Sequence, residues 1–353
     1  LIIFASGKIM GFMSKTYFKT LAFFVASAAL LFTACSKKDT KQDTDSKGLP
    51  ASGGKTLEVV LVVPEELYNG EVKDSVGTYF MKACKGLSQP EPLFDVVQMN
   101  PKGFFNSDML QKHRNVIIID LKPGNPNKLK QAIDYKSYPQ AYFEFSVDNR
   151  DSLFALIARY EGFIRNKFYE NEHKRVYAAF RKLENTEVTR KLKKKFGFWL
   201  TVSDEFYMAT EEDNFVWLRK EPKDGSLDIM IYTMPYTGEG LFKEEKILEL
   251  RDKIAKQYIP GPAKGSYMGT ETRFLCERQQ VKIGNLEAVE TRGLWRLFND
   301  WMGGPFVNYC FKDKANNRFV MIDCFLYSPR HPKRDQLMQL ESIVYGIKFD
   351  KHS

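Results

Sequence analysis

The sequence predicts an α+β protein: an N-terminal α/β domain followed by an antiparallel-sheet α+β domain. Three observations carry this prediction. Short apolar strand-like runs alternate with helical patterns up to Val147, a long helical stretch follows, and closely spaced strand patterns take over after Phe196. Apolar residues make up 43% of the 353 residues and charged residues 27%, which excludes a disordered or fibrous chain.

The first domain is expected over residues 56–185. β-Branched apolar runs predict buried strands at 57–63 (LEVVLVV) and 116–121 (VIIIDL), with further strands at 93–99 and 141–147. Apolar residues at helical spacing predict helices over 72–84 and 105–112. The domain closes with a basic helical stretch over 151–183, which as one helix would be about 50 Å long, so that a break is expected near Asn171.

Positive charge is concentrated along most of that stretch and in the residues directly after it. Residues 159–195 contain twelve Lys or Arg and five acids, in a chain of formal net charge +9. One interpretation is a patch that meets lipid phosphates or another anionic envelope polymer. The other is a solvated helix face followed by a charged hinge at Lys191, Lys193, Lys194 and Lys195. No nucleic-acid-binding motif is present, and no nucleic-acid partner is expected.

The second domain is expected over residues 196–350. Strand patterns lie at 198–202, 206–209, 215–220, 227–233 and 286–292, and a hairpin is expected around Asn316-Asn317. Helices are predicted over 244–258 and 335–345, the second leading into a short strand at 347–349. This order is loosely similar to that of the PsbP-type sandwich, a resemblance of order that implies nothing about function.

Residues 1–34 are expected to carry a targeting signal. Residues 1–12 look like upstream or alternative-start sequence, and from Met13 a basic segment precedes the uncharged stretch 21–34. That stretch ends in Leu31-Phe32-Thr33-Ala34-Cys35, which resembles the lipobox of bacterial lipoproteins. The resemblance implies cleavage after Ala34 and lipidation of Cys35. An ordinary secretory leader with an incidental cysteine is the alternative.

Residues 35–55 are expected to form the lipidated cysteine and a flexible tether, because the stretch has a single large apolar residue, Leu49. Ser36 follows the cysteine, which by the sorting rule of lipoproteins implies the outer membrane. The mixed Lys/Asp run could instead resemble a surface-export signal, and the periplasmic and surface faces both stay open.

Segment 292–307 is the main candidate binding motif. Two tryptophans lie beside two arginines and an acid, ahead of an expected Gly-Gly-Pro turn in which the glycines permit positive φ. Such a group could bind a sugar or a peptide; alternatively it is a hairpin whose tryptophans fill the sheet core. The candidate residues are Arg292, Trp295, Arg296, Asp300, Trp301, Gly303, Gly304 and Pro305.

Three segments resemble landmarks of an uncharacterised Bacteroidetes lipoprotein family, defined only as a domain of unknown function. They are Tyr138-Pro139-Gln140, Pro260-Gly261-Pro262 with Gly265-Ser266-Tyr267-Met268, and Met302-Gly303-Gly304-Pro305-Phe306. The match would cover about residues 57–350. The resemblance supports a lipoprotein and implies no catalytic residue.

Cysteine spacing leaves the pairing open. Besides Cys35 the chain has Cys84, Cys276, Cys310 and Cys324, an even number that permits disulfides in an oxidising compartment. Cys310 and Cys324 flank one hairpin. One strand register would place them on the same face and nearly adjacent, and a shift of one residue would place them on opposite faces. No spacing suggests a metal site.

No catalytic signature is found: the chain has no GxSxG, HExxH or GxxxxGK[ST] motif. The four histidines, His113, His173, His331 and His352, are expected at the surface. Asp120 and Asp323 are expected to be separate solvent-facing carboxylates, or else an acid pair if the domains meet there.

These observations predict a lipid-anchored cell-envelope protein that serves binding or assembly, with the membrane as one partner and an envelope protein or anionic envelope polymer as another. No cofactor is expected. The alternative is an envelope hydrolase acting on glycan or peptide, with Trp295, Asp300 and Trp301 near its site.

Overall fold

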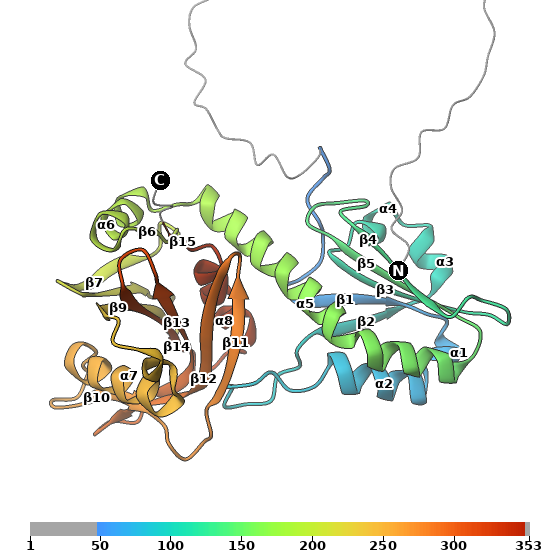
Figure 1. Ribbon diagram of the computed structural model, residues 1–353. Helices are drawn as coiled ribbons and strands as arrows, with labels where there is room; N and C mark the ends of the chain where they lie inside the picture. Colours follow the sequence, from blue (N-terminus) through green and yellow to red (C-terminus); the bar gives the residue numbers. More distant parts are fainter. Residues whose placement is uncertain (1–47, 350–353) are drawn as a thin grey trace, which may run out of the picture.

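The computed structural model describes residues 48–349 (Figure 1). The expected signal peptide, Cys35 and most of the expected tether lie outside the described residues. Within the described chain the predicted fold class is confirmed: a mixed, mostly parallel sheet forms the first part, and a larger antiparallel sheet with helices forms the second. No helix among these residues is long and apolar enough to cross a membrane.

The first sheet has the strand order β2-β1-β3-β5-β4. Its parallel strands are β1 (Glu58–Val62), β2 (Asp95–Met99), β3 (Asn115–Leu121) and β5 (Ala141–Val147), all close to predicted positions. The edge strand β4 (Lys128–Ile133) runs antiparallel to β5. Its sequence, KLKQAI, lacks a run of β-branched residues, which is why the sequence pattern missed it.

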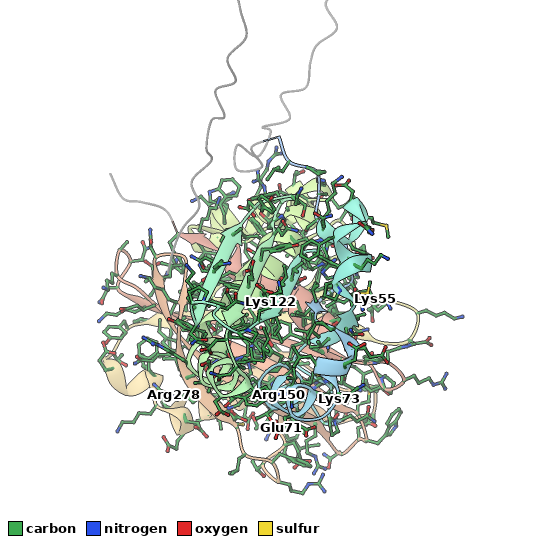
Figure 2. The ribbon with its side chains drawn as sticks, turned by 90° about the vertical axis from the view of Figure 1, so that its right-hand side faces the viewer. Lys55, Glu71, Lys73, Lys122, Arg150 and Arg278 are labelled. Atoms are coloured by element: carbon green, nitrogen blue, oxygen red, sulfur yellow. The ribbon has the colours of Figure 1, made fainter. Side chains whose placement is uncertain are left out.

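Helices cover both faces of this sheet (Figure 1). On one face lie α1 (Glu65–Tyr68), α2 (Glu71–Phe80) and the first half of α5 (Arg150–Lys182). The opposite face carries α3 (Pro101–Phe105) and α4 (Asp108–Gln111), two short helices where one was expected. Figure 2 shows Glu71 and Arg150 side by side at the start of α2 and α5, 3.6 Å apart.

Helix α5 is continuous, and the break expected near Asn171 is absent. Asn171, Glu172 and His173 are buried where α5 passes between the domains: Glu172 pairs with Arg114 of the first domain (2.9 Å), and the second half of α5 packs against α8 (Arg334–Tyr345) of the second domain. The first domain therefore covers the first half of α5, and the second domain covers its second half.

The second sheet has the order β10-β12-β13-β14-β9-β8-β7, with β11 paired to β12. The strands are β7 (Tyr207–Glu212), β8 (Phe215–Lys220), β9 (Ser226–Pro235), β10 (Tyr267–Thr270), β11 (Glu277–Ile283), β12 (Leu286–Phe298), β13 (Gly303–Asp313) and β14 (Arg318–Tyr327). One face packs against α8, α6 (Thr186–Phe196) and the small pair β6 (Phe198–Trp199) and β15 (Lys348–Phe349). The other face is covered by α7 (Glu244–Tyr258), which follows the 3-10 turn η2 (Glu239–Phe242).

The lysine run that was interpreted either as a basic patch or as a charged hinge lies in helix α6. Val188, Leu192 and Phe196 recur every fourth residue and are buried, while the lysines between them point outward. The Asn185 side chain accepts a hydrogen bond from the Val188 N–H (3.1 Å), and Gly197 ends the helix in the left-handed conformation. The basic run therefore forms an amphipathic helix.

Candidate functional site

The turn between β12 and β13 is the centre of the predicted binding motif. The turn comprises residues 299–302, and Gly303, Gly304 and Pro305 already belong to β13, so the expected Gly-Gly-Pro turn was wrong. Asn299 provides the positive φ (61°), and neither Gly303 nor Gly304 has one. Asn299 is a residue type that tolerates this conformation at low cost.

Hydrogen bonds hold this turn against a neighbouring loop. The Asn299 side-chain amide donates to the carbonyl of Gly265 (3.2 Å), and a carboxylate oxygen of Asp300 accepts from the Ala263 N–H (3.3 Å). The other Asp300 oxygen accepts from the Trp301 N–H (2.7 Å). Asp300 therefore ties the backbone at Trp301 to the loop that contains Ala263.

The two tryptophans of the motif lie in opposite environments. Trp295 is buried in the core under α7, packs edge-on against Phe325, and donates its indole N–H to the Leu326 carbonyl (3.1 Å). Trp301 is 80% exposed and contacts Tyr327 edge-on, with ring centroids 6.2 Å apart. The core interpretation thus holds for Trp295 and fails for Trp301.

An open cavity of about 410 Å³ lies next to this exposed tryptophan. Tyr327 and Met302 line its apolar side, and a second hollow of about 300 Å³ adjoins it through shared residues that include Tyr327. Most of the remaining wall is charged and comes from the end of β8, the β8–β9 loop and the loop after β14: Arg219, Glu221, Lys223, Asp224 and Arg330.

Ion pairs fix part of this wall. The Arg219 guanidinium lies 3.0 Å from Asp228 and 3.1 Å from Glu221, and stacks over the Trp217 ring. Burial raises the pKa of Asp228 to about 6, although Arg219 and the Trp217 indole N–H (2.9 Å) act in the opposite direction. Lys223 and Arg330 stay exposed at the rim. The cavity therefore offers one aromatic side and charged groups of both signs.

The two arginines of the motif are not at this cavity. Arg292 lies on the opposite face of β12 from Trp295, between Glu290 (2.7 Å) and Glu341 of α8 (2.7 Å). Burial alone would lower its pKa, but the two carboxylates outweigh that effect and hold the pKa well above its usual value. Arg296, partly exposed, lies 3.8 Å from Glu271. The structure therefore brings together Trp301 with Met302 and Tyr327, and separates the arginines from them.

Two histidines expected at the surface are buried, so those predictions were wrong. His113 is 2.9 Å from a Glu58 oxygen, and burial lowers its pKa. His173 stacks on Tyr345 (3.8 Å) and contacts the Ser342 hydroxyl (3.1 Å). Charged neighbours suggested exposure, and His173 is buried because its part of α5 packs against α8, a contact that the local sequence does not record.

The carboxylates considered as an acid pair lie in different domains. Asp120 is partly exposed, and a hydrogen bond from Lys122 lowers its pKa. Asp323 is fully buried beneath α7 and pairs with Arg251 (2.8 Å), so its expected exposure was wrong. Burial raises the pKa of Asp323, against the effect of Arg251. Among residues 48–349 no group of three His, Cys, Asp or Glu side chains is placed to hold a metal ion.

The β13–β14 register decides the relation between Cys310 and Cys324. Cys310 lies opposite Met321, and Cys324 lies opposite Val307. Cys310 consequently packs under α7 and Cys324 under α8, on opposite faces of the sheet. Strands in this register cannot bridge the two sulfurs, and all four cysteines of the described chain are free.

Comparison with known proteins divides the chain at the end of α5. Residues 52–181 match the model of a Domain of unknown function (DUF8532), and residues 185–346 match that of a second Domain of unknown function (DUF4837). The chain contains two domains of unknown function. The expected resemblance is confirmed to the extent that the chain contains domains of unknown function. No curated protein matches the chain.

Several solved structures resemble part of the chain. Among them, the Saccharomyces cerevisiae Ran-binding protein Mog1p is 8% identical over 43% of this chain and 89% of its own, with a TM-score of 0.28. The lipid transfer and protein localization domain of human StarD13 (DLC2) is 9% identical over 44% of this chain and 92% of its own, with a TM-score of 0.18. Likenesses at these scores carry no argument about function.

Proposed function

We propose that this protein is a lipid-anchored cell-envelope protein, held in the outer membrane through Cys35, and that it acts as a binding or assembly module. The lipobox-like segment before Cys35 supports the anchor, as does the resemblance to a Bacteroidetes lipoprotein family. Three acyl chains on one cysteine give very stable attachment to a bilayer. The protein then works at a membrane surface.

The observation that carries the binding role is the exposed Trp301, whose ring partner Tyr327 and chain neighbour Met302 line the open cavity. A tryptophan that is 80% exposed keeps a large apolar ring in water, while hydrogen bonds at Asp300 and Asn299 order its turn. Aromatic rings presented in this way bind the apolar faces of sugars or the side chains of peptides. The charged wall of the cavity would supply polar contacts to the same ligand.

The alternative of an envelope hydrolase draws no comparable support. Of the residues assigned to it, Trp295 is buried and Asp300 is engaged with backbone N–H groups. At the cavity, Glu221 is paired with Arg219 and accepts a hydrogen bond from Tyr207. Binding is therefore the favoured function, and the experiment below would detect hydrolysis if it occurs.

Crosslinking and pull-down of the full chain from intact envelopes tests the binding role. One partner, a protein or a glycan, should be recovered at fixed stoichiometry with the wild type. Trp301→Ala should lower recovery about tenfold or more, as expected for a tryptophan at the centre of a contact. Trp199→Ala is the matched control, because Trp199 is also exposed but lies on β6, and it should leave recovery unchanged.

Equal recovery with both variants would overturn the proposed site. Release of glycan or peptide fragments by the purified protein would replace the binding role with the hydrolase. The anchor is tested separately: cells fed labelled palmitate should label the wild type and leave Cys35→Ser unlabelled. An unlabelled wild type would refute the anchor.

A further inference from the structure

The side of the first domain formed by α3 and α4 presents large apolar side chains to solvent. Phe105, the last residue of α3, is 54% exposed, and Met109 of α4 is 77% exposed. Tyr135, in the β4–β5 connection, is 58% exposed. Ring contacts run from Phe105 through Phe104 (5.3 Å) and Tyr142 (6.1 Å) to Tyr135 (6.1 Å). We call Phe105, Met109, Tyr135 and Tyr142 the aromatic face.

The first described residues of the chain are fixed to the segments that carry this face. The Tyr138 N–H donates to the Pro50 carbonyl (2.8 Å), and the Ser52 N–H donates to the Tyr138 carbonyl (3.1 Å). On the α4 side, the Gly53 N–H donates to the Lys112 carbonyl (3.0 Å). In Figure 1 this blue segment rises at the end of the first domain where the α4 label stands. The chain thus enters the domain between α4 and the β4–β5 connection.

The distance to the proposed anchor is short. Fourteen residues lie between Cys35 and Pro50. A polar chain of that length has a root-mean-square span of about 20 Å. An anchor at Cys35 would therefore hold the entry point, and the aromatic face beside it, within reach of the bilayer surface.

We propose that the aromatic face rests in the interfacial layer of the same bilayer that holds the Cys35 lipid, so that the protein has a second, non-covalent membrane contact. This inference rests on the proposed anchor. Tyrosine, phenylalanine and methionine side chains suit the boundary between headgroups and acyl chains. Two-point attachment would fix the orientation of the domains above the membrane.

Charge contributes little to this contact. Lys112 pairs with Asp108, Lys136 lies over the Tyr135 ring (5.2 Å), and Asp134 precedes that tyrosine. Positive and negative groups are therefore nearly balanced around the face. Insertion of apolar side chains, with lysine stems extended towards the headgroups, accounts for the contact, and it should persist at high salt.

Site-specific photocrosslinking in intact envelopes tests the inference with the full chain. Met109 is replaced by photoreactive p-benzoylphenylalanine, and covalent adducts with radiolabelled lipid are measured. Leu275 is the matched control position, because it is an apolar residue 95% exposed in the loop between β10 and β11 of the second domain. Lipid adducts should be about tenfold more abundant at position 109 than at 275, and should survive a high-salt wash.

The palmitate label in the same cells separates the two hypotheses. If the protein carries the label but position 109 gives no more lipid adduct than 275, the membrane contact is refuted and the anchor stands. If the label is absent, the anchor fails and the inference fails with it. Adducts at position 109 that contain protein in place of lipid would show that another chain covers this face, and would also overturn the inference.

Discussion

At the scale of the residue, Gly303 and Gly304 are required for a reason that the sequence did not suggest. Both were expected to supply positive φ, yet both are extended in β13. A Cβ on Gly303 would lie 2.8 Å from the Trp295 carbonyl oxygen, and one on Gly304 would lie 2.1 Å from the Leu326 carbonyl oxygen. Close approach of neighbouring backbone therefore demands glycine here.

Substitution of Gly304 tests this explanation. Gly304→Ala should lower the free energy of unfolding by about 1–3 kcal/mol, because the added methyl group meets backbone that cannot rotate away. Gly240→Ala is the control, since a Cβ at Gly240 has no heavy atom within 4 Å, and its effect should stay within about 1 kcal/mol. Urea denaturation followed by circular dichroism measures both. Equal effects would contradict the explanation.

At the scale of the element, the contact between α5 and α8 explains why a polar stretch of helix is buried. His173 of α5 stacks on Tyr345 and contacts Ser342, both on α8. Burial lowers the pKa of His173 from 6.5 to about 3, helped by Arg292 and opposed by Glu290. The neutral imidazole is therefore part of the junction between the two domains.

This pKa predicts a specific pH dependence. Between pH 6.5 and about 3 the unfolded chain binds a proton on this histidine that the folded chain does not. The contribution of His173 is therefore complete above pH 6.5 and decreases by about 1.4 kcal/mol per pH unit as the pH falls below that value.

The measurement compares wild type with His173→Phe, which keeps an aromatic ring against Tyr345. Denaturant unfolding at a series of pH values should give a constant difference in unfolding free energy above pH 6.5. Below that pH the wild type should lose stability relative to the variant. Parallel curves down to about pH 4 would show that the histidine is protonated in the fold.

At the scale of the whole molecule, the domains are joined by groups that one domain supplies to the other. Helix α8 has no side-chain cap of its own. The Glu91 carboxylate of the first domain accepts from the N–H groups of Lys333 (2.7 Å) and Arg334 (2.9 Å) at its start. Arg334 in turn pairs with Asp95 of β2 (2.8 Å). A carboxylate of the first domain thus caps the N-terminus of a helix of the second domain.

Removal of this acid should weaken the whole molecule. Glu91→Ala should reduce the unfolding free energy by about 1–2 kcal/mol, the usual cost of losing an N-terminal cap. Glu287→Ala provides the comparison, because Glu287 is exposed on β12 and its removal should have little effect. Thermal unfolding by calorimetry distinguishes the two. An unchanged midpoint for Glu91→Ala would exclude the capping role.

The patterns that predicted well are those with a strong local period. The runs LEVVLVV and VIIIDL became β1 and β3, and the amphipathic stretch at 244–258 became α7. Strands without such a run were missed: β4 and β11 consist largely of polar residues and are held by pairing to β5 and β12. These strands are stabilised by backbone pairing with the next strand in the chain, which hydrophobic periodicity does not record.

The candidate site was predicted in part. The motif around Trp301 drew attention to the β12–β13 turn, but the cavity beside it depends on Arg219, Tyr327 and Arg330, which belong to other strands and loops. Arg292 lies on β12 before that turn, and it faces α8 because side chains alternate between the two faces of a strand. Proximity in sequence therefore joined residues that the sheet separates.

The sequence by itself determined the fold class and most strands and helices, because these depend on composition and short-range periodicity. Its location at a membrane stays a prediction from the segment before Cys35. Only the tertiary structure decided which tryptophan is exposed, which histidines are neutral and buried, and on which face each cysteine lies. Those properties depend on strand register and on the packing of α5 against α8, which bring together residues far apart in the chain.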